Sequence, residues 1–404
     1  MTFGKGAFAC AVLGFACSDP EVSSKPTWYR DVLPITQTHC MSCHTAGGVG
    51  SFSMDLDPAD PESYAGLQRA AKSIATAVRA GHMPPFPPDP ACREYLAERR
   101  VSDDEKHVVQ SWADSGAARG DPKDAPLPLA IAELDRVDLA LELGESYLPT
   151  SLEYTDVQCF VLDPALTVPT DVTGLRVIPG SQRVRDVLVF RADRAAAQAA
   201  DAADAASGFD CFGSPLGGGL VGSWVPGMPP MLYPEGTAVR LDAESALVLQ
   251  ITYDLASAEA TEDRTGLELR FADAPVARPV SIQVLTHDTF SLPAMTRDVT
   301  ASTSMALADA GVVWGVAAEL RRRGEAASLR LQTAGGPACL LEIPNYNAGW
   351  QELYLVRDEA GIGFAAGDTL ELDCTWDNSS MLEIGPGPNP TDELCVAYLL
   401  TTAL

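Results

Sequence analysis

From about residue 130 onward, short β-rich runs alternate with turn residues, and long stretches of helical period do not occur. Strands at this spacing are typical of β-sandwiches. Length favours two sandwiches, with a break between residues 274 and 279, and an Ala-rich stretch at 192–207 is expected to form a short helix in a loop. Examples of the expected strands are 175–178, 184–190, 247–253, 267–271, 280–285, 329–331, 339–343, 352–356 and 369–374.

The first quarter of the chain carries helical patterns instead. We expect a helix within 28–43 and a second over 63–80, where apolar residues recur at helical spacing before Gly81. Ser102 and Glu105 form a capping-box pattern that begins a third helix, which stops at Gly116. Residues 122–128 have the composition of a linker.

A Cys-x-x-Cys-His string at residues 40–44 is the strongest chemical signal. This is the attachment pattern of a c-type haem. Thiols at Cys40 and Cys43 face one side of a helical turn and can form two thioethers, and His44 can then serve as the proximal iron ligand. The alternatives are a redox dithiol, which wants a βαβ setting, and half of a zinc site, which wants a second Cys or His pair nearby.

The sixth iron ligand is expected to be Met83, which lies in a stiff Pro-rich loop after Gly81. His/Met ligation raises the reduction potential and suits electron transfer. His82 is the nearest competitor. The remaining candidates are weaker, because they lie too close to the attachment string or read as surface or core residues; they are Met54, Met41, His39 and His107.

Together these features resemble a monohaem cytochrome c domain over about residues 28–121, carried by Cys40, Cys43, His44, the Met83 loop and the helix containing Trp112. The following region, roughly 135–404, resembles the copper type II, ascorbate-dependent (peptidylglycine α-hydroxylating) monooxygenases. That likeness rests on scattered phrases at 158–160, 211–213, 224–227, 247–253, 350–354, 377–379 and 392–395. The family has two jelly-roll-like β-sandwiches, each holding one copper ion.

The fold class implied is multidomain: an α-helical cytochrome c domain (28–122), then two mainly antiparallel, jelly-roll-like β-sandwich domains (123–275 and 276–404). The chain departs from the family at every expected copper ligand, where it has Arg185, Asp186, Thr252, Ala317, Glu319 and Leu394. After residue 108 the only histidine is His287, and type II copper sites need several imidazoles. We therefore predict no copper.

The resemblance also implies disulfides between Cys159 and Cys211 and between Cys374 and Cys395. Cys92 and Cys339 stay unassigned; if they pair, they would join the haem-binding part to the second sandwich. Asp373, Asp377 and Glu383 would suit a hard cation, but a solvated acidic loop is the simpler interpretation in so acidic a chain.

The N-terminus predicts export. A basic residue, a short apolar run and small residues before Cys17 resemble a bacterial lipoprotein signal (1–17), followed by a tether (18–27). Cys17 would be the lipidated residue, with ordinary cleavage nearby as the alternative. No later run is long and apolar enough for a transmembrane helix. We expect a periplasmic or cell-surface location, with a lipid anchor as the only membrane contact.

The formal net charge of −27 would repel phosphate, so nucleic acid is not an expected partner. We found no phosphate-binding loop and no nucleophile elbow. The sequence predicts an exported electron-transfer protein with one covalent haem, a redox partner protein and a β region used for docking or ligand binding. Two alternatives stay open: an oxidoreductase that receives electrons through the haem, and a surface binding module whose haem is structural or sensory.

Overall fold

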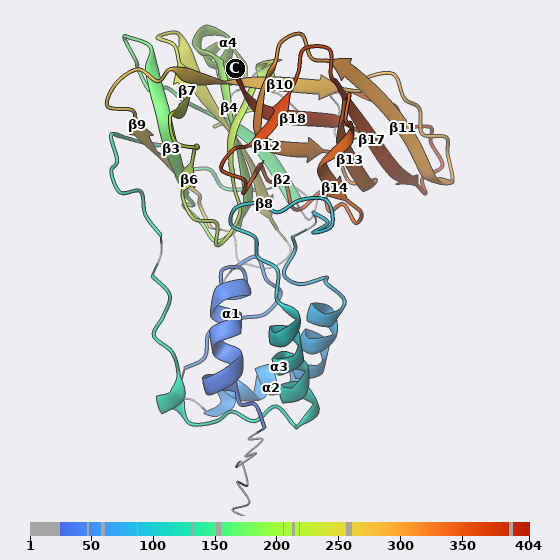
Figure 1. Cartoon of the computed structure of the whole chain (residues 1–404). Helices are drawn as coiled ribbons and strands as arrows, with labels where there is room; N and C mark the ends of the chain where they lie inside the picture. Colours follow the sequence, from blue (N-terminus) through green and yellow to red (C-terminus); the bar gives the residue numbers. More distant parts are fainter. Residues whose placement is uncertain are drawn as a thin grey trace, which may run out of the picture.

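The computed structural model describes residues 25–46, 48–57, 61–86, 88–130, 132–150, 155–204, 206–211, 215–217, 219–255, 261–387 and 391–404. The expected signal and Cys17 lie outside these residues. The described chain is predominantly β. Figure 1 shows three of its helices grouped below a β-rich body that contains the strands.

The helical segment, residues 27–118, contains a π-helical turn η1 (Trp28–Val32) and helices α1 (Leu33–His39), α2 (Pro61–Arg79) and α3 (Asp103–Asp114). Trp28 packs against Trp112 within one cluster of buried side chains. Ser102 accepts a hydrogen bond from the Glu105 backbone, and Glu105 accepts one from Ser102 in return, so the capping box forms as expected. Elements η1 and α1 lie within the expected range 28–43, and α1 ends at His39.

The β region begins after a short 3-10 turn, η2 (Pro122–Asp124). Its remaining helical elements are α4 (Arg194–Asp201), within the expected Ala-rich stretch, and η3 (Pro215–Gly217). Its strands are β1 (Leu139–Glu142), β2 (Thr155–Leu162), β3 (Thr170–Ile178), β4 (Val184–Asp193), β5 (Gly219–Trp224), β6 (Met231–Leu232), β7 (Thr237–Leu241), β8 (Ser245–Asp254), β9 (Gly266–Phe271), β10 (Arg278–Thr286), β11 (Thr296–Ala306), β12 (Gly311–Glu319), β13 (Gly324–Thr333), β14 (Gly336–Ile343), β15 (Tyr354–Leu355), β16 (Ile362–Phe364), β17 (Thr369–Asn378) and β18 (Val396–Ala403).

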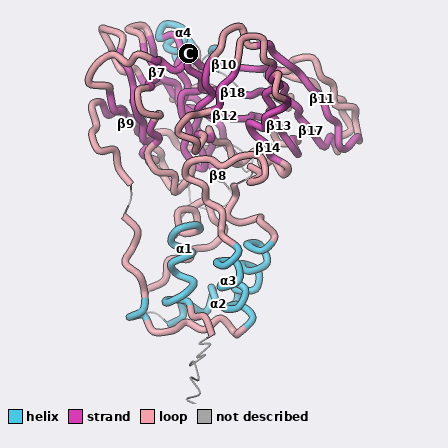
Figure 2. The backbone as a smooth tube through the Cα atoms, viewed as in Figure 1, coloured by secondary structure: helices cyan, strands magenta, loops and turns pink. Residues whose placement is uncertain are grey.

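These strands form three sheets within the described residues. The long sheet has ten strands and runs β1-β9-β3-β7-β10-β18-β12-β15, with β16 beside β12 and β6 beside β3. Two smaller sheets have four strands each, β2-β8-β4-β5 and β11-β17-β13-β14. In Figure 2 the strands fill the upper body and the helices lie below, apart from α4.

The expected fold class is therefore wrong. The described chain is predominantly β, with its strands in three sheets, and only four α-helices lie among the described residues. The β region is also not two separate sandwiches, because the long sheet is continuous across the expected break. Strand β10 pairs in parallel with β7 on one side and antiparallel with β18 on the other. Strand pairings between distant residues set this continuity, and local sequence patterns do not report them.

The middle strands of the long sheet are buried on both faces. In β18, Tyr398 and Leu400 belong to the apolar cluster shared with the β2-β8-β4-β5 sheet. Their neighbours Ala397 and Leu399 belong to the cluster shared with the β11-β17-β13-β14 sheet. Each small sheet thus packs against opposite sides of the same strand. This explains why β12 and β18 are almost continuously buried and show no polar alternation.

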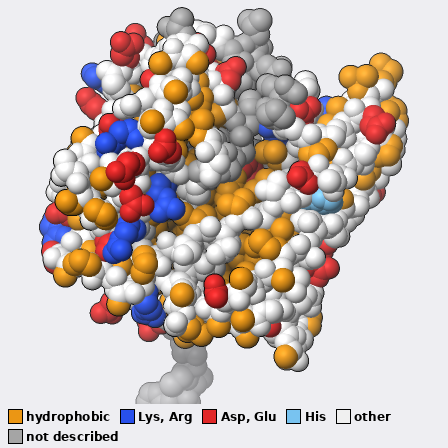
Figure 3. Space-filling view, turned by 90° about the horizontal axis from the view of Figure 1, so that it is seen from above, with side chains coloured by type: hydrophobic (Ala, Val, Ile, Leu, Met, Phe, Trp, Pro, Cys, Tyr) orange, Lys and Arg blue, Asp and Glu red, His pale blue; other side chains and the backbone are white. Residues whose placement is uncertain are grey.

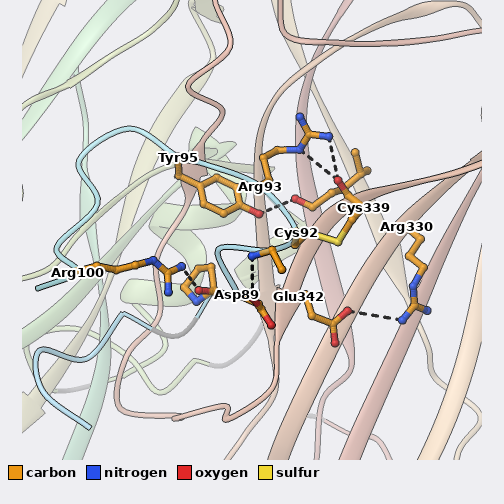
Figure 4. Close-up of a disulfide and its surroundings, with 11 residues drawn as sticks. Asp89, Cys92, Arg93, Tyr95, Arg100, Arg330, Cys339 and Glu342 are labelled. Atoms are coloured by element: carbon orange, nitrogen blue, oxygen red, sulfur yellow. Dashed lines mark hydrogen bonds and ion pairs between the residues drawn. A yellow bond between two sulfur atoms is a disulfide. The ribbon is translucent and has the colours of Figure 1, made fainter. Parts of the chain in front are cut away.

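The connection between α2 and α3 (residues 80–102) leaves the helical segment and enters the β region. Cys92 forms a disulfide with Cys339 of β14, and Figure 4 shows this bond with its surroundings. Tyr95 is fully buried in the cluster of the β11-β17-β13-β14 sheet and donates a hydrogen bond to the Leu340 carbonyl at 2.7 Å. Arg93 donates to the Cys339 carbonyl. This connection fixes the helical segment to the β region.

Figure 3 views the β region from above, on the face turned away from the helical segment. Basic and acidic side chains lie next to one another on one side of this face, and hydrophobic side chains gather near its middle. Among the described residues, no helix has the length and apolar character needed to cross a membrane.

Replacing Leu399 by Ala tests the doubly covered strand. Leu399 is fully buried, so its truncation is expected to lower the free energy of unfolding by about 2–5 kcal/mol. Chemical denaturation measures this loss. Leu404→Ala, at an 86% exposed residue after the same strand, is the control and is expected to change little. A loss at Leu399 no larger than at Leu404 would contradict burial on both faces.

Candidate functional site

A cavity of about 500 Å³ lies where the helical segment meets the β region. Cys40, Cys43 and His44 line it from the turn after α1, and Met83 lines it from the α2–α3 connection. Much of its wall is apolar: Val49, Phe52, Met54, Ala70, Ile74, Ala77, Val78, Pro84 and Pro85. Arg99, Arg185, Asp254, Asn347 and Trp350 are among the residues that close it on the side of the β region.

The Cys40–His44 turn is held by backbone hydrogen bonds. The amide of His44 donates to the Cys40 carbonyl at 3.0 Å, and the amide of Gly50 donates to the Cys43 carbonyl at 2.9 Å. A Cβ at Gly50 would lie 2.4 Å from His44 Nδ1, so only glycine permits this approach. The backbone at Gly50 thereby lies directly against the histidine ring.

Phe52 orients the His44 ring through a hydrogen bond and a ring contact. The Nδ1 atom of His44 lies 3.0 Å from the Phe52 carbonyl oxygen, which can only accept, so Nδ1 carries the proton. The ring also packs on Phe52, with centroids 4.6 Å apart. The neutral tautomer then leaves Nε2 without a proton and able to bind a metal.

Of the cysteines that the structure describes, Cys40 and Cys43 are the two outside disulfides. Burial raises the pKa of Cys40 to about 12, and burial also raises the pKa of Cys43 although Ser42 and Arg99 oppose the shift. A redox dithiol needs a lowered pKa, because the thiolate is its nucleophile. The turn also follows a helix and belongs to no βαβ unit. The dithiol alternative therefore lacks support.

The candidate sixth ligands occupy different places. Met83 lines the cavity and is 42% exposed. Met54 also lines it, but its amide donates to the His44 carbonyl at 2.7 Å, which places it beside His44. His39 has both ring nitrogens engaged, by the Arg99 carbonyl and by Glu105. Met41 packs against the helical cluster, whereas His82 and His107 are exposed and line no part of this cavity.

Sequence reasoning missed the wall formed by the β region. The Arg99 guanidinium pairs with buried Glu352 and lies 5.1 Å from the centre of the Trp350 ring. These residues are about 250 positions apart, so no spacing pattern connects them. The consecutive pair Arg99 and Arg100 before the Ser102 cap was the only local sign of basic character.

Three of the positions that the monooxygenase likeness assigned to copper, Asp186, Thr252 and Glu319, are buried polar residues. Asp186 on β4 is 1% exposed and accepts a hydrogen bond from Thr252 on β8 at 2.9 Å. Glu319 on β12 is buried and accepts one from Tyr398 at 2.8 Å. Burial raises the pKa of Asp186 to about 7, with a further contribution from the charge of Glu319. Ala317 is buried and Leu394 packs against the same apolar cluster.

The structure contains disulfides Cys159–Cys211 and Cys374–Cys395, the pairs implied by the likeness, and also Cys92–Cys339. The acidic residues discussed for a hard cation have other partners. Asp373 accepts from Ser302 and Arg330, and Glu383 accepts from Ser291 at 2.5 Å. Asp377 lies 3.4 Å from Arg297. His287 lies beside Phe290, with ring centroids 5.6 Å apart.

Replacing Asp186 by Asn tests the buried carboxyl. Its folded pKa lies above the usual value of about 4, so the folded state binds more protons between about pH 4 and pH 7. This group therefore lowers stability as the pH rises through that window, by up to about 1.4 kcal/mol per pH unit. Asp186→Asn should remove that slope, as measured by denaturant titration from pH 4 to 8. Asp309→Asn, at an exposed carboxyl, is the control; unchanged slopes in both variants would contradict the assignment.

Comparisons with known proteins do not place the chain in a family. No family model matches, and no curated protein matches. Solved structures with weak likeness include the STIV MCP (8% identity, 66% of this chain and 96% of that chain, TM-score 0.26). They also include the major capsid protein P2 from bacteriophage PM2 (8%, 66% and 97%, 0.24) and a Paenibacillus xanthan lyase (12%, 72% and 29%, 0.19). These TM-scores are too low to carry an argument.

The likeness to a cytochrome c domain fused to a copper monooxygenase-like region is therefore wrong. No family model and no curated protein supports it, and the described chain is predominantly β with its strands in three sheets. Within the described residues, no group of three or more His, Cys, Asp or Glu side chains could hold a metal ion. The descriptions of the chain as a cytochrome c and as a monooxygenase-like fold are therefore wrong, and no cluster of His, Cys, Asp and Glu among the described residues supports the expected metal-binding description. The disulfides remain.

Proposed function

We propose that this protein carries one covalently attached haem in the cavity between the helical segment and the β region, and that it transfers electrons. The proposal rests on one observation: the Cys-x-x-Cys-His turn faces a mostly apolar cavity of about 500 Å³ on which Met83 also lies. It depends on these residues and not on a likeness to any family.

The residues present fit such a group in three respects. Cys40 and Cys43 are the thiols outside the disulfides of the described chain and would form the thioethers. His44 is fixed by the Phe52 carbonyl with Nε2 available to iron. Met83 approaches the cavity from a different segment of the chain and would supply a thioether ligand. Bound in this way, haem iron supplies one-electron chemistry.

The protein's own part in electron transfer is to hold and shield that group. Apolar side chains from α2, among them Ala70, Ile74 and Val78, cover part of the cavity and keep water away. Low polarity and a Met ligand both favour a high reduction potential. The chain's net charge of −27 suits a redox partner protein with a basic surface.

We also propose that the protein is exported and anchored by a lipid at Cys17. Three disulfides suit an oxidising compartment, where such bonds persist. The N-terminal pattern of a basic residue, a short apolar run and small residues before Cys17 supports the anchor. Membrane fractionation of a Cys17→Ala variant separates the lipid anchor from simple secretion.

A second candidate is an oxidoreductase that receives electrons through the haem. One observation favours it: a groove of about 1290 Å³ adjoins the cavity and shares Ser42, Val49 and Pro226 with it. The groove also contains Trp224 and Met228 of the β region. Metal analysis distinguishes the candidates, since a second stoichiometric redox metal would favour the oxidoreductase.

Covalent attachment is tested by replacing Cys40 and Cys43 with Ala together. We expect no haem to remain with the chain after denaturation, because both thioethers are lost. Haem staining of denaturing gels and intact mass measure this on protein matured in an exporting host. Cys159→Ala with Cys211→Ala, at a disulfide that does not line the cavity, removes the same number of sulfurs and is expected to keep the haem. Haem retained by the first variant, or absent from the wild type, would overturn the proposal.

The sixth ligand is tested by Met83→Ala. Loss of the thioether is expected to abolish the methionine-to-iron charge-transfer band, to lower the reduction potential, and to let the ferrous form bind carbon monoxide. His82→Ala, at the adjacent residue, is the matched control and should leave the spectrum unchanged. A wild-type protein that lacks this band, and whose spectrum changes in His82→Ala but not in Met83→Ala, would assign the ligand to His82.

A further inference from the structure

Two arginines lie on the cavity wall formed at the β region, in a chain with 28 basic and 55 acidic residues. Arg99 comes from the α2–α3 connection and Arg185 from β4. Asp254 is the acidic side chain that lines the described cavity. Basic groups are therefore concentrated at this wall against the overall charge of the protein.

Arg99 is rigidly held but incompletely hydrogen-bonded. Its side chain is 10% exposed, and its Nη2 pairs with buried Glu352. Its guanidinium lies 5.1 Å from the Trp350 ring centre and 5.5 Å from that of Phe86. Within the described chain, its Nε and Nη1 have no hydrogen-bond partner. Buried guanidinium groups without partners are costly, so a partner that is not part of the chain is expected there.

Arg185 and Arg99 contact two consecutive residues of the β region, Gly349 and Trp350. A Cβ on Gly349 would come 2.9 Å from the Arg185 guanidinium carbon, so the Gly349 backbone packs directly against that group. The following residue, Trp350, packs on Arg99. Arg185 Nε lies 3.6 Å from Asp186 Oδ2, and neither atom makes a hydrogen bond within the described residues. Arg185 thus has an ion-pair neighbour but spare donors.

We propose that Arg99 and Arg185 form a carboxylate-binding subsite that holds the acidic side groups of the haem. This inference rests on the proposed function. Planar guanidinium groups donate paired hydrogen bonds that match carboxylate geometry, and haem carries two carboxylate side groups. The opposite wall, near α2, is apolar and offers no comparable donors among the residues described. The subsite would orient the haem with its acidic edge toward the β region.

The subsite has an electrostatic consequence. A positive charge near the iron disfavours the oxidised form, so both arginines should raise the reduction potential. They should also keep the haem carboxyl groups ionised at neutral pH, because a nearby guanidinium lowers a carboxyl pKa. Removing either arginine should lower the potential and make it vary with pH near neutrality. Asp186 faces Arg185 and has a pKa raised by burial to about 7, so it adds its own pH dependence in this window; the Arg99 variant, which leaves the Arg185–Asp186 pair in place, separates the two contributions.

The experiment is a spectroscopic redox titration of the full, matured protein between pH 5 and 8. Arg185→Gln is the first variant, and we expect roughly a tenfold rise in the oxidised-to-reduced ratio at fixed potential, about 59 mV for one electron. Arg185→Lys keeps the charge and should keep most of the potential. Arg99→Gln combined with Glu352→Gln avoids leaving a buried charge unpaired and should lower the potential likewise. Arg297→Gln, at an exposed residue of β11, is the control.

The outcomes separate this inference from the proposed function. Wild-type protein without covalent haem would overturn both. Wild-type haem with unchanged potential and pH dependence in Arg185→Gln and in the double variant would overturn the subsite alone. A wild-type potential that shifts with added acetate would show that the arginines bind an acid from solution, and this also would overturn the assignment to the haem.

Discussion

The α2–α3 connection is the constraint on which the site depends. A stretch of about twenty residues leaves a small helical unit, buries Tyr95 in the core of the β region and returns to begin α3 at Asp103. The disulfide from Cys92 to β14 and the ion pair from Arg99 to Glu352 attach this stretch to the β region at two separate points. Since Met83 and Arg99 both belong to this stretch, its anchoring determines where two walls of the cavity stand relative to the Cys40–His44 turn.

The β region supplies a rigid body for that anchoring. Central strands covered on both faces cannot shift register without moving apolar side chains out of two clusters at once. Strand β14 carries Cys339 and the Leu340 carbonyl that accepts the Tyr95 hydrogen bond, and it buries Leu340 and Leu341 in the apolar cluster that also contains Leu399 of β18. The wall containing Arg185, Gly349 and Trp350 is therefore positioned by the same packing that stabilises the fold.

Local features were predictable from the sequence, and distant ones were not. The Ser102–Glu105 cap and the apolar spacing in α2 depend on residues three or four positions apart, so the pattern shows them directly. The pairing of β10 with β7 and with β18 joins residues up to about 120 positions apart. The sequence therefore predicted two separate sandwiches where the sheet is continuous. Strand β11 is half-exposed and has no apolar run, so its sequence gives little local indication of a strand. For the cavity, the Cys40–His44 string carried its own signal, whereas Arg99, Glu352 and Trp350 meet only in three dimensions.

The Cys92–Cys339 bond joins residues that are 247 positions apart. Every strand from β1 to β13, with the first residues of β14, lies inside the covalent loop that it closes. A protease that cuts once anywhere within that loop leaves two pieces that are still joined by sulfur. The helical segment would thus stay attached to the C-terminal half of the β region after a nick, and only a reducing step would release it. Cleavage of one peptide bond within the loop therefore cannot separate the helical segment from the C-terminal half of the β region.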